Sequence, residues 1–161
     1  FRCVATNTLK WNEHIKEITK KANSRMFCLR ECRWANLPTE VGITCYMTKI
    51  RILLEYGSPI WGGIPQYLVD ELENIQARCL RILGIPKDSL PSQLERRNLQ
   101  TIKEYERIIN DDLNPLNNYI QSPVHQYSLR SQTSRNCPFI RSYTDRHKQS
   151  FLPRSVFLSS H

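Results

Sequence analysis

Apolar residues recur every three to four positions along most of the first 120 residues, a period that predicts α-helices. The first such segment predicts a helix from residue 12 to about residue 35. Asn12 is its expected N-cap, Glu13 lies in its first turn, and Leu37-Pro38 bounds it because a residue before proline avoids the α conformation. Its apolar face consists of Ile15, Ile18, Ala22, Met26 and Leu29.

Two further segments keep the same period. Thr39 is the expected cap of a second helix, which should end or kink in the glycine- and proline-containing stretch from Gly57 to Gly63. Its apolar positions are Val41, Cys45, Ile50, Leu53 and Leu54. The third helix has the most regular pattern, with Gly84 expected just after its last turn. Its apolar positions are Leu68, Leu72, Ile75, Cys79 and Leu83.

The later segments predict shorter elements. Residues 92–97 are expected to form a short helix, and the capping box Thr101–Glu104 is expected to open a separate helix that runs to about Asp112. One more turn is expected at 116–120. Residues 122–145 have the composition of a loop or disordered tail. Residues 151–158 are expected to form a terminal helix that docks or frays.

These patterns predict an all-α fold, a small helical bundle over residues 12–120. Residues 1–11 are expected to be a short strand remnant, and residues 121–161 a loosely structured basic tail. A chain of 161 residues is long enough for one domain with its own core. It begins with Phe1-Arg2-Cys3-Val4 and not with Met, so we expect a fragment of a longer protein.

Charge adds a candidate partner. The chain carries 23 Lys and Arg against 15 Asp and Glu, a net charge of +8. Residues 1–35 and 121–161 each have a net charge of +5, whereas residues 36–120 have a net charge of −2. Basic ends favour a polyanionic partner, nucleic acid first and an anionic membrane second. The alternative, a surface that is charged only for solubility, stays open on charge alone.

A second stripe on the first predicted helix, at the same 3.6-residue period, mixes basic and aromatic residues. Cations bind phosphates and rings pack on sugars or bases, so the stripe predicts a nucleic-acid site. The candidate residues are Lys16, Lys20, Arg30, Phe27 and Trp34, with Asn23 between them. Two alternatives remain open: the rings form a second packing face against another helix or a missing domain, and the cations are merely solvated.

The tail offers a second basic-aromatic segment, which either folds over RNA or is an ordinary disordered tail. Its cations are Arg130, Arg135, Arg141, Arg146, Lys148 and Arg154, and its rings are Tyr127, Phe139 and Tyr143.

Other chemistry is not indicated. Six cysteines in a chain of this length suggest a reducing, intracellular compartment. His14, Cys28, Cys32 and Cys45 have the side chains of zinc ligands but not the spacing, so we expect no metal. We also expect no cofactor, no small-molecule ligand, no membrane span and no independent enzymatic activity, because nucleophile and nucleotide-binding motifs are missing.

Several blocks, in order, resemble the reverse transcriptases of LINE-type (non-LTR) retrotransposons, most closely jockey-type elements. They cover nearly the whole chain and end with a tail block similar to "SFxPR". The blocks are Leu9-Lys10-Trp11-Asn12-Glu13-His14-Ile15, Lys21-Ala22-Asn23-Ser24-Arg25, Ile52-Leu53-Leu54-Glu55-Tyr56-Gly57-Ser58-Pro59-Ile60-Trp61, Leu72-Glu73-Asn74-Ile75-Gln76-Ala77-Arg78-Cys79-Leu80-Arg81-Ile82, Tyr127-Ser128-Leu129-Arg130-Ser131 and Ser150-Phe151-Leu152-Pro153-Arg154.

The resemblance implies the thumb and following region of an RNA-directed DNA polymerase, which would hold the RNA/DNA primer–template beside a missing palm domain. The family's catalytic "[FY]xDD" hairpin would precede residue 1. Asp111-Asp112 follows a helical pattern and is not assigned to metal binding, so no catalytic residue is expected here. The alternative function is an inert or domesticated helical protein-interaction module with no nucleic-acid role.

Overall fold

The structure is a computed structural model that describes residues 3, 11–121 and 144–159. Within these residues the chain is helical and contains no strand, which confirms the predicted all-α class. Its helices are α1 (Asn12–Trp34), α2 (Thr39–Cys45), a π-helical turn (Tyr46–Arg51), α3 (Ile52–Glu55), α4 (Ser58–Trp61), α5 (Gln66–Leu83), a 3₁₀ turn (Lys87–Ser89), α6 (Gln93–Ile109), α7 (Pro115–Gln121), α8 (Asp145–Lys148) and α9 (Phe151–Ser159).

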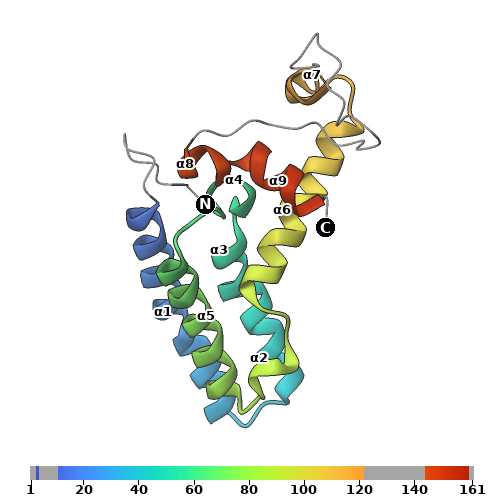
Figure 1. Cartoon of the computed structure of the whole chain (residues 1–161). Helices are drawn as coiled ribbons and strands as arrows, with labels where there is room; N and C mark the ends of the chain where they lie inside the picture. The colour runs from blue at the N-terminus through green and yellow to red at the C-terminus, as the bar shows by residue number, and fades with distance from the viewer. Residues whose placement is uncertain (1–2, 4–10, 122–143, 160–161) are drawn as a thin grey trace.

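Four helical arms form the bundle (Figure 1). The α1 helix descends in the view of Figure 1, the bent arm made of α2, the π-helical turn, α3 and α4 returns, α5 descends beside α1, and α6 returns beside the bent arm. Helices α1 and α5 are therefore parallel neighbours. Two hydrogen bonds mark their shared direction: Arg78 Nη1 donates to Asn23 Oδ1 and Arg33 Nη1 donates to the Leu83 carbonyl oxygen.

The main core lies between α1, α5 and the bent arm, and it uses the apolar faces that the sequence predicts for α1 and α5. The bent arm differs at its start, because Val41 is 44% exposed. Gly42 is the residue that faces inward there, and the side chain of Leu83 packs directly on it. The fully buried members of this core include Ile15, Ala22, Leu29, Tyr46, Ile50, Leu54, Trp61, Leu72 and Cys79.

The predicted end of the second helix is confirmed at Gly57, which has φ 66. This left-handed backbone is favourable for glycine and turns the chain into α4, where Pro59 occupies the first turn. The turn places the Trp61 ring in the core, and its indole N–H donates to the Tyr56 carbonyl oxygen at 2.8 Å.

Two predicted caps lie one residue from the observed ones. Asn12 and Thr39 are the first helical residues of α1 and α2, while Trp11 and Pro38 occupy the cap positions without a side-chain cap bond. Pro38 fits this place because its fixed φ and missing N–H are tolerated at a helix start. The predicted C-terminal cap of α5 is confirmed, since Gly84 has φ 72.

The prediction of two separate helices at 92–97 and 101–112 is wrong, because α6 is continuous from Gln93 to Ile109. Ser92 and Glu95 form the capping box that starts it. Thr101 lies fully buried in mid-helix, and its hydroxyl donates to the Arg97 carbonyl oxygen at 2.8 Å. A threonine that bonds back to the fourth preceding carbonyl is compatible with an uninterrupted helix.

The terminal segment docks as a helix, one of the two outcomes expected for it. Helix α9 crosses the upper part of α6 and α4 (Figure 1). It completes a second, smaller apolar cluster whose members are Tyr105, Ile108, Ile109, Ile120, Phe151, Leu152 and Val156. Most of the predicted strand remnant at 1–11 and most of the predicted loop at 122–145 lie outside the described residues.

Candidate nucleic-acid interface

The two faces of α1 have opposite exposure. The predicted core face is buried, from Ile15 at 0% to Ile18 at 7%. The basic-aromatic stripe is on the other side, where Lys16, Lys20 and Arg30 are exposed. At about 100° per residue, the five candidate positions fall within roughly 80° of one another around the helix. The structure therefore brings all five predicted site residues together on one exposed face.

The aromatic members of the stripe are largely exposed to solvent. Phe27 is 58% exposed and Trp34 is 86% exposed. Within the described residues, neither ring is buried against another helix of this bundle, which was one of the alternatives left open by the sequence. Packing against a domain outside this chain is the other alternative, and it stays open.

The cations of the stripe are available for an external anion. Lys16 pairs with Glu13 at 3.1 Å, but both side chains are mostly in solvent, where such a pair contributes little. Among the described residues, Lys20 and Arg30 have no ion-pair partner. Lys21, which lies off the stripe, is held by Glu17 at 2.5 Å.

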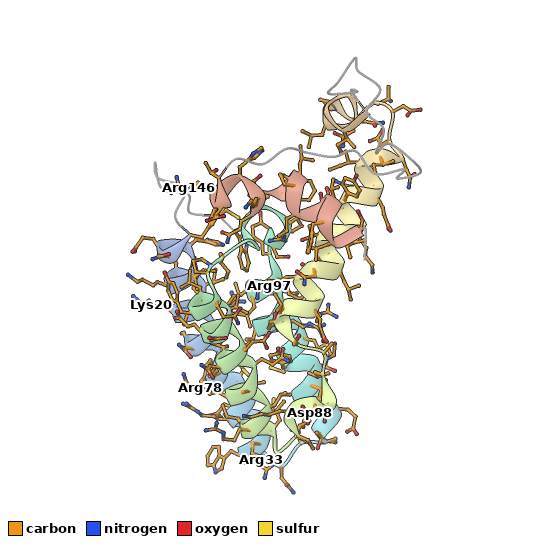
Figure 2. All side chains as sticks on the ribbon, in the orientation of Figure 1. Lys20, Arg33, Arg78, Asp88, Arg97 and Arg146 are labelled. Atoms are coloured by element: carbon orange, nitrogen blue, oxygen red, sulfur yellow. The ribbon has the colours of Figure 1, made fainter. Side chains whose placement is uncertain are left out.

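Helix α5 contributes a cation that is not among the predicted residues of the stripe. Arg78 is exposed and donates to Asn23 Oδ1 at 3.2 Å, which holds its guanidinium beside the middle of the stripe. Figure 2 shows Lys20, Arg78 and Arg33 along the α1–α5 side of the bundle. The sequence places Arg78 on the polar face of α5, but it does not indicate that this face lies next to α1.

The tail cations divide into different groups. Arg146 and Lys148 are exposed on α8. Arg154 is not a surface cation, because its side chain is partly buried and donates to the Thr101 hydroxyl. The candidates Tyr127, Arg130, Arg135, Phe139, Arg141 and Tyr143 lie outside the described residues.

The possible zinc ligands do not form one set. His14 is 1% exposed and contacts the rings of Trp11 and Trp61 edge-on, and burial lowers its pKa. Burial raises the pKa of the Cys45 thiol, and the nearby Cys32 and Cys28 add to this effect. In the part of the chain that the structure describes, no group of three or more His, Cys, Asp or Glu could hold a metal ion.

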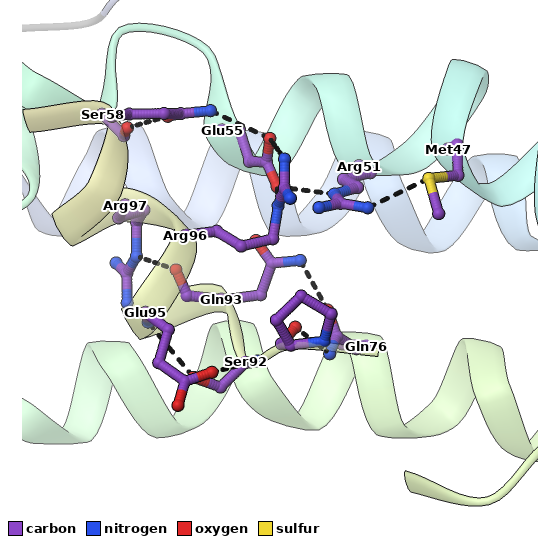
Figure 3. A network of polar contacts seen from close by, with 12 residues as sticks. Met47, Arg51, Glu55, Ser58, Gln76, Ser92, Gln93, Glu95, Arg96 and Arg97 are labelled. Carbon is purple, nitrogen blue, oxygen red and sulfur yellow. Dashed lines mark hydrogen bonds and ion pairs between the residues drawn. The ribbon is translucent and has the colours of Figure 1, made fainter. Parts of the chain in front are cut away.

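A partly buried polar cluster that the sequence did not predict joins the bent arm to α6 (Figure 3). The Glu55 carboxylate accepts from Arg51 Nε at 2.7 Å, from Arg96 Nε at 2.5 Å and from Gln100 Nε2 at 2.9 Å. With both arginines and an amide on one carboxylate, the cluster has the arrangement of a structural ion network. Its role is to hold α6 against the arm.

The adjacent acids Asp111 and Asp112 follow the end of α6 and are exposed. Asp111 accepts from the Leu113 N–H through its side chain at 3.1 Å, the geometry of a turn. No described helix is both long and apolar enough to cross a bilayer. Comparison with known proteins gives no matching family model, no matching curated protein and no matching solved structure.

Proposed function

We propose that this chain is a thumb-like module of a non-LTR retrotransposon reverse transcriptase, which positions an RNA/DNA primer–template without a catalytic centre of its own. The observation that carries the proposal is the exposed face of α1, where Lys16, Lys20 and Arg30 alternate with Phe27 and Trp34. The order of the sequence blocks supports the proposed reverse-transcriptase family, and the exposed face of α1 supports the proposed binding of nucleic acid.

The mechanism is positioning through the backbone of the nucleic acid. Ammonium and guanidinium groups along one helix neutralise phosphates and fix the register of the duplex without reading its sequence. The rings of Phe27 and Trp34 pack on sugars or on unstacked bases. Arg78 adds a phosphate contact from α5. A missing palm domain would supply the carboxylates and metal ions for nucleotide addition.

The test is the salt dependence of binding to an RNA–DNA duplex. Each phosphate contact should contribute about 0.9 to the slope of log K against log salt. Replacing Lys16, Lys20 and Arg30 by Ala should flatten this slope by about 2–3, with the helical circular dichroism unchanged.

A matched control removes the same charge elsewhere. Lys21, Lys103 and Arg107 are three exposed cations off the stripe, and their replacement by Ala should change the slope by less than one unit. Equal slopes for the two triple variants would mean that the stripe has no special role and would reject the proposal.

A second candidate function is a helical protein-interaction module. It is favoured by the apolar residues at the turn between α1 and α2, where Trp34, Leu37 and Val41 are 86%, 47% and 44% exposed. Exposed apolar groups gathered at one end of a bundle are typical of a protein-binding surface. Binding to this surface would depend weakly on salt, which separates it from the nucleic-acid proposal.

A further inference from the structure

Two guanidinium groups lie together where α9 crosses α6. Arg97 is 1% exposed, with its Cζ atom 5.5 Å from the centre of the Trp61 ring. Arg154 comes from α9, and one of its terminal nitrogens donates to the Thr101 hydroxyl, one turn beyond Arg97 on α6. Burial, with the charge of Arg97 added to it, lowers the pKa of Arg154 to about 10, so Arg154 is charged at pH 7. A guanidinium is protonated in proteins as a rule, so Arg97 is charged as well.

Much of the hydrogen-bonding capacity of this pair is unused within the protein. Arg97 Nε donates to the Gln93 carbonyl oxygen at 3.1 Å, but Arg97 Nη1 and Nη2 and Arg154 Nε are buried without a protein acceptor. A buried charge with unmade hydrogen bonds is strongly unfavourable, and two like charges side by side add repulsion.

No acidic side chain of this chain neutralises the pair. All 15 Asp and Glu residues lie within the described ranges, and none forms an ion pair with Arg97 or Arg154. Glu73 acts on Arg97 only at a distance, and its carboxylate accepts the Leu94 N–H at 2.9 Å. A negative charge that neutralises the pair must therefore be supplied by a group other than an Asp or Glu side chain of this chain.

The loop between α4 and α5 is shaped for this arrangement. Gly62 lies against the guanidinium of Arg154, and a Cβ atom at Gly62 would collide with both terminal nitrogens and with the Ser58 carbonyl oxygen. Gly63 lies in the same way against the backbone of Gln149. The pair of glycines thus lets the segment before α9 and the head of Arg154 approach the bundle closely.

We infer that Arg97 and Arg154 form a binding site for one small oxyanion, a phosphate or a carboxylate, which bridges α6 and α9. Guanidinium forks fit both groups, because each presents oxygens at the spacing of the N–H donors. The anion would complete the hydrogen bonds of the pair, offset its repulsion and hold α9 on the bundle. This site is separate from the α1 stripe and does not depend on nucleic-acid binding.

The test uses the whole chain with inorganic phosphate and with acetate, each at constant ionic strength and pH 7. Equilibrium dialysis of labelled anion should give one saturable site per chain, and the thermal midpoint should rise with the concentration of the bound anion. Saturation by phosphate identifies a phosphate site; saturation by acetate alone identifies a carboxylate site.

Three variants locate the site. Arg154→Gln should weaken the anion about ten- to a hundredfold, because it removes a charged donor pair, and Gly62→Ala should weaken it by displacing Arg154 with both charges kept. Arg107→Gln, an exposed arginine of the same α6 helix that pairs with Glu104, should bind like the parent. The inference is overturned if neither anion saturates the parent chain, or if Arg154→Gln binds as tightly as the parent.

Discussion

The phenol of Tyr46 donates a hydrogen bond of 2.8 Å to the side-chain oxygen of Gln76, in the interior of the bundle. Gln93 Nε2 donates to both of these atoms, at 3.1 Å to the phenol oxygen and at 2.7 Å to the amide oxygen. The three residues come from the π-helical turn, α5 and α6. Their bonds tie the bent arm, α5 and α6 together where none of the three groups reaches water.

Replacing Tyr46 by Phe should lower the free energy of unfolding by about 1–3 kcal/mol, because the Gln93 amide loses a buried acceptor without a replacement. Urea unfolding measures the loss. Tyr67→Phe is the matched control, since Tyr67 is 57% exposed and its loss of a hydroxyl should change stability little. Equal effects of the two substitutions would mean that the network adds nothing.

Leu72→Ala should cost about 2–5 kcal/mol of unfolding free energy, because Leu72 is fully buried in the main core and truncation leaves a cavity. The same change at Leu99, which is 53% exposed on α6, should cost much less. Thermal and urea midpoints check both. An unchanged midpoint for the Leu72 variant would show that α5 does not anchor the core.

The exposed rings of α1 predict a separation of binding from stability. Phe27→Ala and Trp34→Ala should each weaken duplex or single-strand binding by about 1–3 kcal/mol if the ring stacks on a base, with the unfolding midpoint unchanged. A fluorescence anisotropy titration and a thermal melt of the same sample measure the two quantities. A lowered midpoint with unchanged affinity would assign the rings to protein packing.

His14 predicts a pH dependence of stability. Burial lowers the pKa of His14, with Glu17 acting to raise it and Lys21 to lower it. The unfolded chain therefore binds the proton first, and the free energy of unfolding should fall as the pH drops below the ordinary histidine value of 6.5 toward the lower folded pKa. Well above pH 6.5 the imidazole is neutral in both the folded and the unfolded chain, so it does not make the free energy of unfolding depend on pH. His14→Phe, which cannot titrate, should lose this part of the pH profile.

The start of α6 can be tested at its cap. Ser92→Ala should cost about 0.5–2 kcal/mol, because the Glu95 N–H loses its acceptor and the capping box is broken. Ser89→Ala, in the 3₁₀ turn just before it, is the control at a position that caps no α-helix. Similar losses at both positions would argue against Ser92 as the start of the helix.

The sequence predicted the features that depend on the local spacing of apolar residues and on the conformational preference of single residues. The two faces of α1 follow from its 3.6-residue repeat, and Gly57 and Gly84 end their helices because the left-handed backbone suits glycine. The choice between Ser92 and Thr101 could not be made this way. Both begin a Ser/Thr-x-x-Glu pattern, and only burial in the assembled bundle places Thr101 inside a helix.

Relationships between distant residues were also out of reach. Arg154 was assigned to a basic tail because residues 121–161 have a net charge of +5, whereas its neighbours in space are Thr101 and Gly62. Arg78 and Asn23 are 55 positions apart and become neighbours only because α1 and α5 run parallel. Side-chain type alone does not distinguish a surface cation from one enclosed by helices that pack later.

The π-helical turn at Tyr46–Arg51 sets the phase between the two halves of the bent arm. A π turn accommodates one more residue than an α turn, so deletion of a single residue there would let the arm relax into a regular α-helix. Because the π turn absorbs the extra residue, the helix after such a deletion would keep nearly its present phase, and Glu55 would still face Arg96. A frame-preserving loss of one codon in this stretch would therefore retain both the helix content and the contact between the arm and α6, whereas the same loss within a regular α-helix such as α5 would rotate the residues after it by about 100°.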